Sequence, residues 1–158
     1  MVCAGHPVDK SVSFHRPEMK PTVWRILIAD DHERVRKSYR SLMETRRDLE
    51  VCGEATNGQE AVVKAEQCVP DLILLDVSMP VLDGFSAAKK IRELLPGIPI
   101  LMLSMNDSAQ MMRSSREAGA QGFVPKQRSS KVLLKAVGVL LAGGTFFSKG
   151  NKRQNKSS

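Results

Sequence analysis

Short apolar segments alternate with longer stretches of helical periodicity along most of this chain, and this alternation limits the fold more than any other feature. Parallel strands cannot be closed by a tight turn, so strict alternation with short connections predicts five parallel strands joined by right-handed crossovers. We therefore expect a doubly wound α/β domain. Strands are predicted at residues 24–29, 49–55, 71–75, 98–103 and 121–124. Helices are predicted around Val35, Tyr39, Leu42 and Met43 and at residues 58–67, 84–95, 107–118 and 129–142.

Both ends of the chain differ in composition from this alternating segment. Residues 1–22 contain three prolines and no sustained period, which predicts a flexible leader. Residues 146–158 are predicted to be a disordered basic tail, so the domain is expected over residues 23–145. The net charge of +7 also sits at the ends, because residues 26–148 carry only +1. That distribution argues against a domain that binds nucleic acid through a uniformly basic surface.

The three cysteines, Cys3, Cys52 and Cys68, lack the spacing of a zinc site or a redox motif. Cys52 and Cys68 lie in apolar strand-like and helix-like contexts, which favours buried free thiols. No apolar run approaches the ~20 residues of a membrane span, and the start of the chain lacks the apolar core of a signal peptide. We expect a reducing cytoplasmic compartment and no membrane partner.

Polar side chains follow four of the predicted strands. Asp30 and Asp31 end the first strand, Asp76 the third and Ser104 the fourth, and the fifth strand runs into Lys126. The carboxyl ends of parallel strands meet at one edge of the sheet, where ligands bind in open α/β folds. Carboxylates that converge there repel one another by about 4 kcal/mol per pair at 4 Å, for an effective dielectric near 20.

This set of side chains suits phosphoryl transfer. A hard divalent cation relieves the repulsion, and Mg²⁺ accepts one or two carboxylates together with waters and phosphate oxygens. The Lys126 ammonium and the Ser104 hydroxyl can each bind an oxygen of a transferring phosphoryl group. Asp76 is the expected nucleophile, because a carboxylate that attacks phosphorus forms an aspartyl phosphate. Each acidic residue alone is more simply a helix cap or a turn residue, but their joint occurrence with Ser104 and Lys126 favours the site.

Four segments carry a resemblance to a known family: ILIADD (26–31), DLILLDVSMPVLDG (71–84), ILMLS (100–104) and AGAQGFVPK (118–126). In this order and spacing they resemble the receiver domain of bacterial two-component response regulators. The sequence LSM and the ending LLAGGTFFS are similar to receivers of the nitrate-response-regulator class, which has LuxR-type output domains. The resemblance implies a flavodoxin-like (βα)5 fold with a five-stranded parallel sheet in the order 2-1-3-4-5.

The resemblance also implies a set of metal ligands. Asp76 would be the phosphoacceptor, and Asp31 and Asp76 would bind Mg²⁺ directly. Asp30 would bind the ion through a water molecule. The backbone carbonyl of Ser78, two residues past the acceptor, would be the third protein ligand.

Ser104 and Phe123 match the switch pair of this family, in which the hydroxyl moves to the phosphate and the aromatic ring turns inward; Phe123 alone also fits a simple core aromatic. Lys126 matches the lysine that binds phosphate. The family usually has proline at the next position, often with a cis bond, whereas this chain has Gln127, so the loop is expected to differ. Met105 stands where many receivers have a small residue, and we expect it to narrow access to the phosphate and slow hydrolysis.

Other residues near these motifs have structural explanations. Met79-Pro80 and Asp83-Gly84 are expected to set the backbone of the loop that leads into the next helix. His32 is expected to face solvent and is given no role in metal binding or phosphorylation.

Three functions are compatible with these residues. The first is a signalling switch: a histidine kinase or phosphotransfer protein phosphorylates Asp76, and the surface formed by residues 107–118, 121–124 and 129–142 changes and controls a downstream protein. Such a domain is not an enzyme beyond its own phosphorylation and dephosphorylation, and it can form a homodimer.

The second function is that of a fragment of a DNA-binding regulator, whose helix-turn-helix domain would follow Ser148. The third, a phosphatase, is disfavoured because a serine stands two residues after the nucleophile, where such enzymes commonly have an acid or base.

Overall fold

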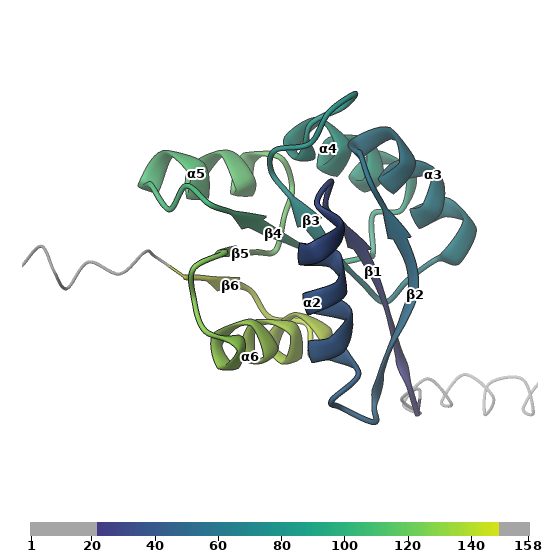
Figure 1. Ribbon diagram of the computed structural model, residues 1–158. Helices are drawn as coiled ribbons and strands as arrows, with labels where there is room; N and C mark the ends of the chain where they lie inside the picture. The colour runs from purple at the N-terminus through teal and green to yellow at the C-terminus, as the bar shows by residue number, and fades with distance from the viewer. Residues whose placement is uncertain (1–21, 149–158) are drawn as a thin grey trace, which may run out of the picture.

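The computed structural model describes residues 22–148; residues 1–21 and 149–158 lie outside the described part. Within residues 22–148 a parallel sheet of six strands is flanked by five helices (Figure 1). The strands are β1 (Trp24–Ala29), β2 (Leu49–Ala55), β3 (Leu72–Asp76), β4 (Ile100–Ser104), β5 (Gly122–Pro125) and β6 (Phe146–Phe147). The helices are α2 (Glu33–Met43), α3 (Gly58–Cys68), α4 (Gly84–Leu94), α5 (Ala109–Glu117) and α6 (Ser130–Leu141).

The strand order is β2-β1-β3-β4-β5-β6, so the predicted order of the first five strands and the doubly wound α/β fold are confirmed. The sheet has a sixth strand beyond the five that were predicted. This strand occupies residues 146–147, where the disordered tail was predicted to begin. The Phe146 amide donates to the Gln121 carbonyl at 3.0 Å, and the Ser148 amide donates to the Phe123 carbonyl at 2.9 Å. A two-residue strand carries no alternation that sequence periodicity could detect. The predicted leader up to residue 21 and the tail beyond Ser148 lie outside the described residues.

Two hydrophobic layers cover the two faces of the sheet. Side chains of α3, α4 and α5 pack against one face, and side chains of α2 and α6 pack against the other (Figure 1). All five residues of β3 are buried, with Leu72 and Leu74 in one layer and Ile73 and Leu75 in the other. This two-sided burial is why the strands of a doubly wound sheet are continuously apolar.

Local sequence signals place the helices as predicted. The Asn57 side chain accepts from the Glu60 amide at 2.8 Å and begins α3, and the Asp83 side chain accepts from the Ser86 amide at 2.8 Å and begins α4. A Cβ atom on Gly84 would lie 2.1 Å from the Asp76 carbonyl oxygen. Glycine therefore allows the start of α4 to lie against the end of β3, which confirms the structural role predicted for Asp83-Gly84.

Candidate functional site

Two buried carboxylates and one ammonium meet at the carboxyl end of the sheet. Asp30 follows β1 and Asp76 ends β3, and these central strands are adjacent. Lys126 follows β5, and its Nζ lies 2.7 Å from Asp30 Oδ2 and 3.1 Å from Asp76 Oδ1. The side chains of Asp30 and Asp76 are 1% and 4% exposed. The structure therefore brings together three of the residues that the sequence places at this edge.

The charges of this cluster are unbalanced. Burial, followed by the nearby Asp30 carboxylate, raises the pKa of Asp76 from 3.8 to about 6, although Lys126 opposes the shift. Burial alone would lower the pKa of Lys126, but its contacts with Asp30 and Asp76 raise it overall. One ammonium thus faces two carboxylates in a site with little water, and additional positive charge would stabilise the ionised form of Asp76.

Asp31 lies at the outer side of this cluster. Its side chain is more exposed than those of Asp30 and Asp76, and its Oδ1 lies 3.2 Å from His32 Nδ1. His32 is mostly exposed, as predicted, yet its Nδ1 also lies 3.4 Å from Asp30 Oδ1. One ligand atom from each of Asp30, Asp31 and His32 lies within 4.8 Å of the others. The sequence reasoning gave His32 no role, and the structure places its ring beside the two acidic residues.

The loop after Asp76 contacts the Asp76 carboxylate and contains a tight turn. The exposed Ser78 donates its amide to Asp76 Oδ1 at 3.3 Å. The Leu82 amide donates to the Pro80 carbonyl at 2.7 Å, and Val81 between them has a φ of 68°. Positive φ is costly for a β-branched residue, so the loop between Asp76 and α4 holds a strained turn.

The loops that follow β4 and β5 are hydrogen-bonded to each other. Ser104 is buried at the end of β4, its Oγ accepts from the Asn106 amide at 2.9 Å, and its carbonyl accepts from the Lys126 amide at 2.7 Å. Gln127 Nε2 donates to the Met105 carbonyl at 2.7 Å. The residue that departs from the family pattern therefore joins the loop of Ser104 to the loop of Lys126. Sequence reasoning had noticed Gln127 as a departure and had not found this contact.

Phe123 lies within β5 and is fully buried. It aligns with Met102 of β4 on one side and with Phe147 of β6 on the other. All peptide bonds within residues 22–148 are trans, including the bond between Lys126 and Gln127.

Helix α2 supplies two neighbours that sequence reasoning missed. Arg36 donates from Nη1 to the backbone carbonyl of Asp30 at 2.9 Å and from Nε to Glu54 Oε1 at 3.0 Å. Burial raises the pKa of Tyr39, and the charges of Asp30 and Asp76 raise it further. Tyr39 was predicted only as part of the helical periodicity, and the contact of Arg36 with the preceding loop leaves no separate sequence signal.

The donor atoms at this edge fit a hard divalent cation. The carboxylate oxygens of Asp30, Asp31 and Asp76 are ligands of the kind that Mg²⁺ prefers, and the single Lys126 ammonium is shared by two of these carboxylates. Asp31 is accessible, whereas Asp30 already accepts from Lys126 through Oδ2 and from the His32 amide through Oδ1 at 2.9 Å.

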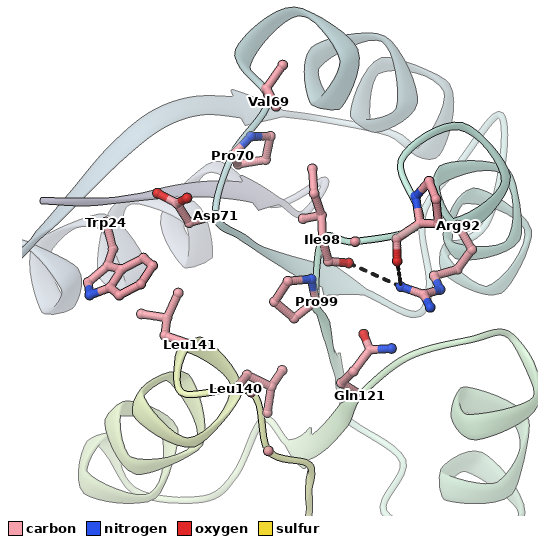
Figure 2. A pocket seen from close by; sticks show the side chains of 14 residues that line it. Trp24, Val69, Pro70, Asp71, Arg92, Ile98, Pro99, Gln121, Leu140 and Leu141 are labelled. Carbon is pink, nitrogen blue, oxygen red and sulfur yellow. Dashed lines mark hydrogen bonds between the residues drawn. The ribbon is translucent and has the colours of Figure 1, made fainter. Parts of the chain in front are cut away.

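A separate cavity of about 560 Å³ lies at the opposite end of the sheet, near the amino ends of the strands (Figure 2). Trp24, Asp71, Arg92, Pro99 and Gln121 are among its lining residues. Its polar side chains bind backbone groups: Asp71 Oδ2 accepts from the Arg25 amide at 2.7 Å, and Arg92 Nη1 donates to the Pro96 carbonyl at 2.7 Å. The cavity lacks converging reactive groups, so the carboxyl end is the candidate functional site.

Comparison with known proteins gives a consistent result. Residues 26–138 match the model of the response regulator receiver domain. The chain is 38% identical over 120 residues to the transcriptional regulatory protein LnrK of Bacillus subtilis, covering 76% of this chain and 54% of LnrK. It is 37% identical over 123 residues to the response regulator protein VraR of Staphylococcus aureus, covering 78% of this chain and 59% of VraR. The chain thus spans little more than half the length of these relatives.

Solved structures show the same similarity. A LuxR-family two-component response regulator from Aurantimonas superposes with a TM-score of 0.78 at 30% identity, covering 85% of this chain and 96% of that structure. The signal receiver domain of the response regulator NarL from Mycobacterium tuberculosis gives a TM-score of 0.74 at 28% identity, covering 78% of this chain and 99% of that domain.

Proposed function

Because this chain belongs to the response regulator receiver family, we propose that it is a phosphoacceptor switch that receives a phosphoryl group on Asp76. The observation that carries the proposal is the buried cluster in which Lys126 Nζ contacts both Asp30 and Asp76. The donor would be a phosphohistidine of a histidine kinase or phosphotransfer protein. A small acyl phosphate would serve as donor in its place.

In the transfer step, a carboxylate oxygen of Asp76 attacks phosphorus as the bond to the donor breaks and the donor group leaves with its electron pair. Lys126 Nζ lies 3.1 Å from Asp76 Oδ1 and would bind a phosphoryl oxygen. Ser104, at the end of the adjacent strand, would provide a hydroxyl donor to another oxygen.

Asp31, Asp76 and the backbone carbonyl of Ser78 would bind Mg²⁺ directly, and Asp30 would bind it through water, as the family resemblance implies. When bound, the ion would supply charge stabilisation for the phosphoryl oxygens. Asp30 would keep a second task, because its contact with Lys126 orients that ammonium toward Asp76.

The switch would act through Ser104 and Phe123 on the surface formed by α5, β5 and α6. Gln127 supports this proposal, because its bond to the Met105 carbonyl joins the loop that follows Ser104 to the loop that follows β5. That surface would control a downstream protein or a homodimer. Hydrogen exchange tests this output surface, because phosphorylation should change the protection of the backbone amides in residues 104–128. Unchanged protection there would contradict the proposed output surface.

Met105 is proposed to slow loss of the phosphoryl group. Its side chain is 65% exposed and follows Ser104 directly, so it can cover the phosphate from solvent. Met105→Ala should release phosphate faster than the unaltered protein. Slower or equal release of phosphate from the variant would contradict this role of Met105.

The test of the main proposal is phosphorylation by acetyl phosphate with Mg²⁺, followed by intact mass. We expect a mass gain of one phosphoryl group that hydroxylamine removes. Asp76→Asn should abolish the gain, whereas Asp71→Asn should keep it, because Asp71 lies just before the same strand, at the opposite end of the sheet. A gain that survives Asp76→Asn, or no gain with Mg²⁺ and donor present, would overturn the proposal.

A second candidate function is that of a receiver within a DNA-binding transcriptional regulator. The observation that favours it is that LnrK is a transcriptional regulatory protein and this chain covers 54% of its length. The coding sequence beyond codon 158 tests the proposal: a helix-turn-helix domain in frame would support it, and a stop codon would contradict it.

The compartment is proposed to be the cytoplasm, where histidine kinases present their phosphorylated histidine. Among the helices of residues 22–148, none has the length and apolar character needed to cross a membrane.

A further inference from the structure

Two free thiols lie together at the β2 edge of the sheet, away from the candidate functional site. Cys52 belongs to β2 and Cys68 is the last residue of α3, which packs over this edge (Figure 1). Both residues are partly buried, so they are also partly accessible to a small solute. The Cys68 Sγ approaches the Cys52 carbonyl oxygen at 3.5 Å.

A β-bulge at Cys52 creates this arrangement. Val51 aligns with Ile26 and Gly53 aligns with Leu27, so Cys52 has no aligned partner in β1. A bulge of this kind breaks the alternation of side chains and re-aims them. Cys52 consequently packs in the layer beneath α3, and a Cβ atom on the next residue, Gly53, would also point toward α3.

Glycine at the second bulge position leaves room for the Cys68 thiol. A Cβ atom on Gly53 would lie 3.1 Å from the Cys68 Sγ, which is tighter than ordinary contact. The bulge turns Cys52 toward α3, and the absent side chain at Gly53 lets Cys68 approach the same backbone. The bulge at Cys52 and the missing side chain at Gly53 therefore both favour the approach of the two cysteines.

We infer that Cys52 and Cys68 form a redox modification site, at which a hydroperoxide oxidant converts the two thiols to a disulfide that ties β2 to the end of α3. The Cys68 Sγ lies 3.5 Å from the carbonyl oxygen of Cys52 itself, so the two side chains start from neighbouring points, and rotation about the Cα–Cβ bond of Cys52 changes the distance between the sulfur atoms. The inference is independent of phosphoryl transfer.

The reaction balances with one hydroperoxide per disulfide. The thiolate of one cysteine attacks a peroxide oxygen, forming a sulfenic acid as the O–O bond breaks; the other oxygen leaves, after protonation, as water from hydrogen peroxide or as an alcohol from an organic hydroperoxide. The thiolate of the second cysteine attacks that sulfur, forming the S–S bond as the S–O bond breaks, and the hydroxide leaves as water after protonation. Burial, followed by the neighbouring Cys68 thiol, raises the pKa of Cys52 to about 11, so we assign the first attack to Cys68.

The experiment oxidises the folded full chain with hydrogen peroxide, alkylates the remaining thiols in denaturant and maps the peptides without reduction. We expect a peptide linked through Cys52 and Cys68, a mass loss of two hydrogens, and alkylation of Cys3 alone. Dithiothreitol should restore all three thiols. Three alkylated thiols after oxidation, or disulfides that join only Cys3 or separate molecules, would overturn the inference.

Two controls distinguish a cysteine pair that the fold brings together from random pairing of thiols. Cys3→Ser should leave formation of the linked peptide unchanged, whereas Cys52→Ser and Cys68→Ser should each prevent it. The same oxidation in urea gives the rate for the unfolded chain. The folded chain should form the Cys52–Cys68 link faster than the unfolded chain; equal or slower formation would show that the fold does not bring the thiols together.

Discussion

The two ends of the sheet use polar side chains in different ways. At the carboxyl end Asp30, Asp76 and Lys126 contact one another, and two carboxylates share one ammonium. At the amino end Asp71 and Gln121 bind backbone groups of neighbouring segments (Figure 2). Polar groups that bind the backbone complete the fold, whereas side chains that bind each other with unbalanced charge remain available for another charged group. The comparison predicts that changes at the carboxyl end alter charge-dependent behaviour, and changes at the amino end alter only stability.

Removal of the shared ammonium should have the largest effect. Lys126→Met leaves Asp30 and Asp76 without their counter-ion, and loss of one partner from a buried ion pair costs about 3–5 kcal/mol. The cost should be smaller well below a pH of about 6, because Asp76 then takes up a proton. Urea unfolding at high and low pH measures this, with the exposed Lys131→Met as the control. An equal cost at both pH values would contradict the charge argument.

Removal of the Asp76 charge should stabilise the protein in the absence of metal. The pKa of Asp76 is raised from 3.8 to about 6, so folding favours its protonated form, and stability falls as pH rises from about 4 through 6. At neutral pH Asp76→Asn should therefore raise the free energy of unfolding by up to about 3 kcal/mol. The gain should vanish at acid pH. Destabilisation of the variant at neutral pH would show that Asp76 is already compensated.

A change at the amino end should affect stability without altering phosphorylation. Gln121 Oε1 accepts from the Ile100 amide at 2.9 Å, and its Nε2 donates to the Gly119 carbonyl at 3.1 Å. Gln121→Ala leaves these groups without that partner, which costs about 1–3 kcal/mol. The loss should be independent of pH, with Gln67→Ala on the exposed side of α3 as the control. A changed rate of phosphorylation per folded molecule would contradict the proposal that the amino end of the sheet affects stability alone.

The smallest effect is expected on the exposed side of α6, away from both ends. Gly138 has open space where a Cβ would be added, so Gly138→Ala should raise stability by about 1 kcal/mol through helix propensity. Thermal unfolding measures the shift, and phosphorylation should be unchanged. A destabilised Gly138→Ala would indicate a contact of α6 that the described residues do not show.

Much of this fold follows from local sequence signals. The apolar run that predicts residues 24–29 as a strand coincides with β1, and the helix predicted at residues 58–67 matches α3, which Asn57 caps. Strand β6 was missed because its two residues pair only after α6 has returned the chain to the edge of β5. Its position depends on tertiary structure, and residue spacing does not encode it.

The candidate site shows the same limit. The ends of the predicted strands identify Asp30, Asp76 and Lys126, because parallel strands bring their carboxyl ends together. The contact of Gln127 with the Met105 carbonyl joins residues 22 positions apart on two loops, and no periodicity or motif connects them. The ion pair between Asp30 and Lys126 likewise depends on side-chain geometry that only the folded chain has.

The most direct test of the central claim is to locate the phosphoryl group after reaction with acetyl phosphate and Mg²⁺. Reduction with borohydride converts an acyl phosphate on aspartate to homoserine, which peptide sequencing identifies at one position. The account predicts homoserine at position 76 and aspartate retained at positions 30, 31 and 71. Homoserine at any of those three positions with Asp76 intact would contradict it.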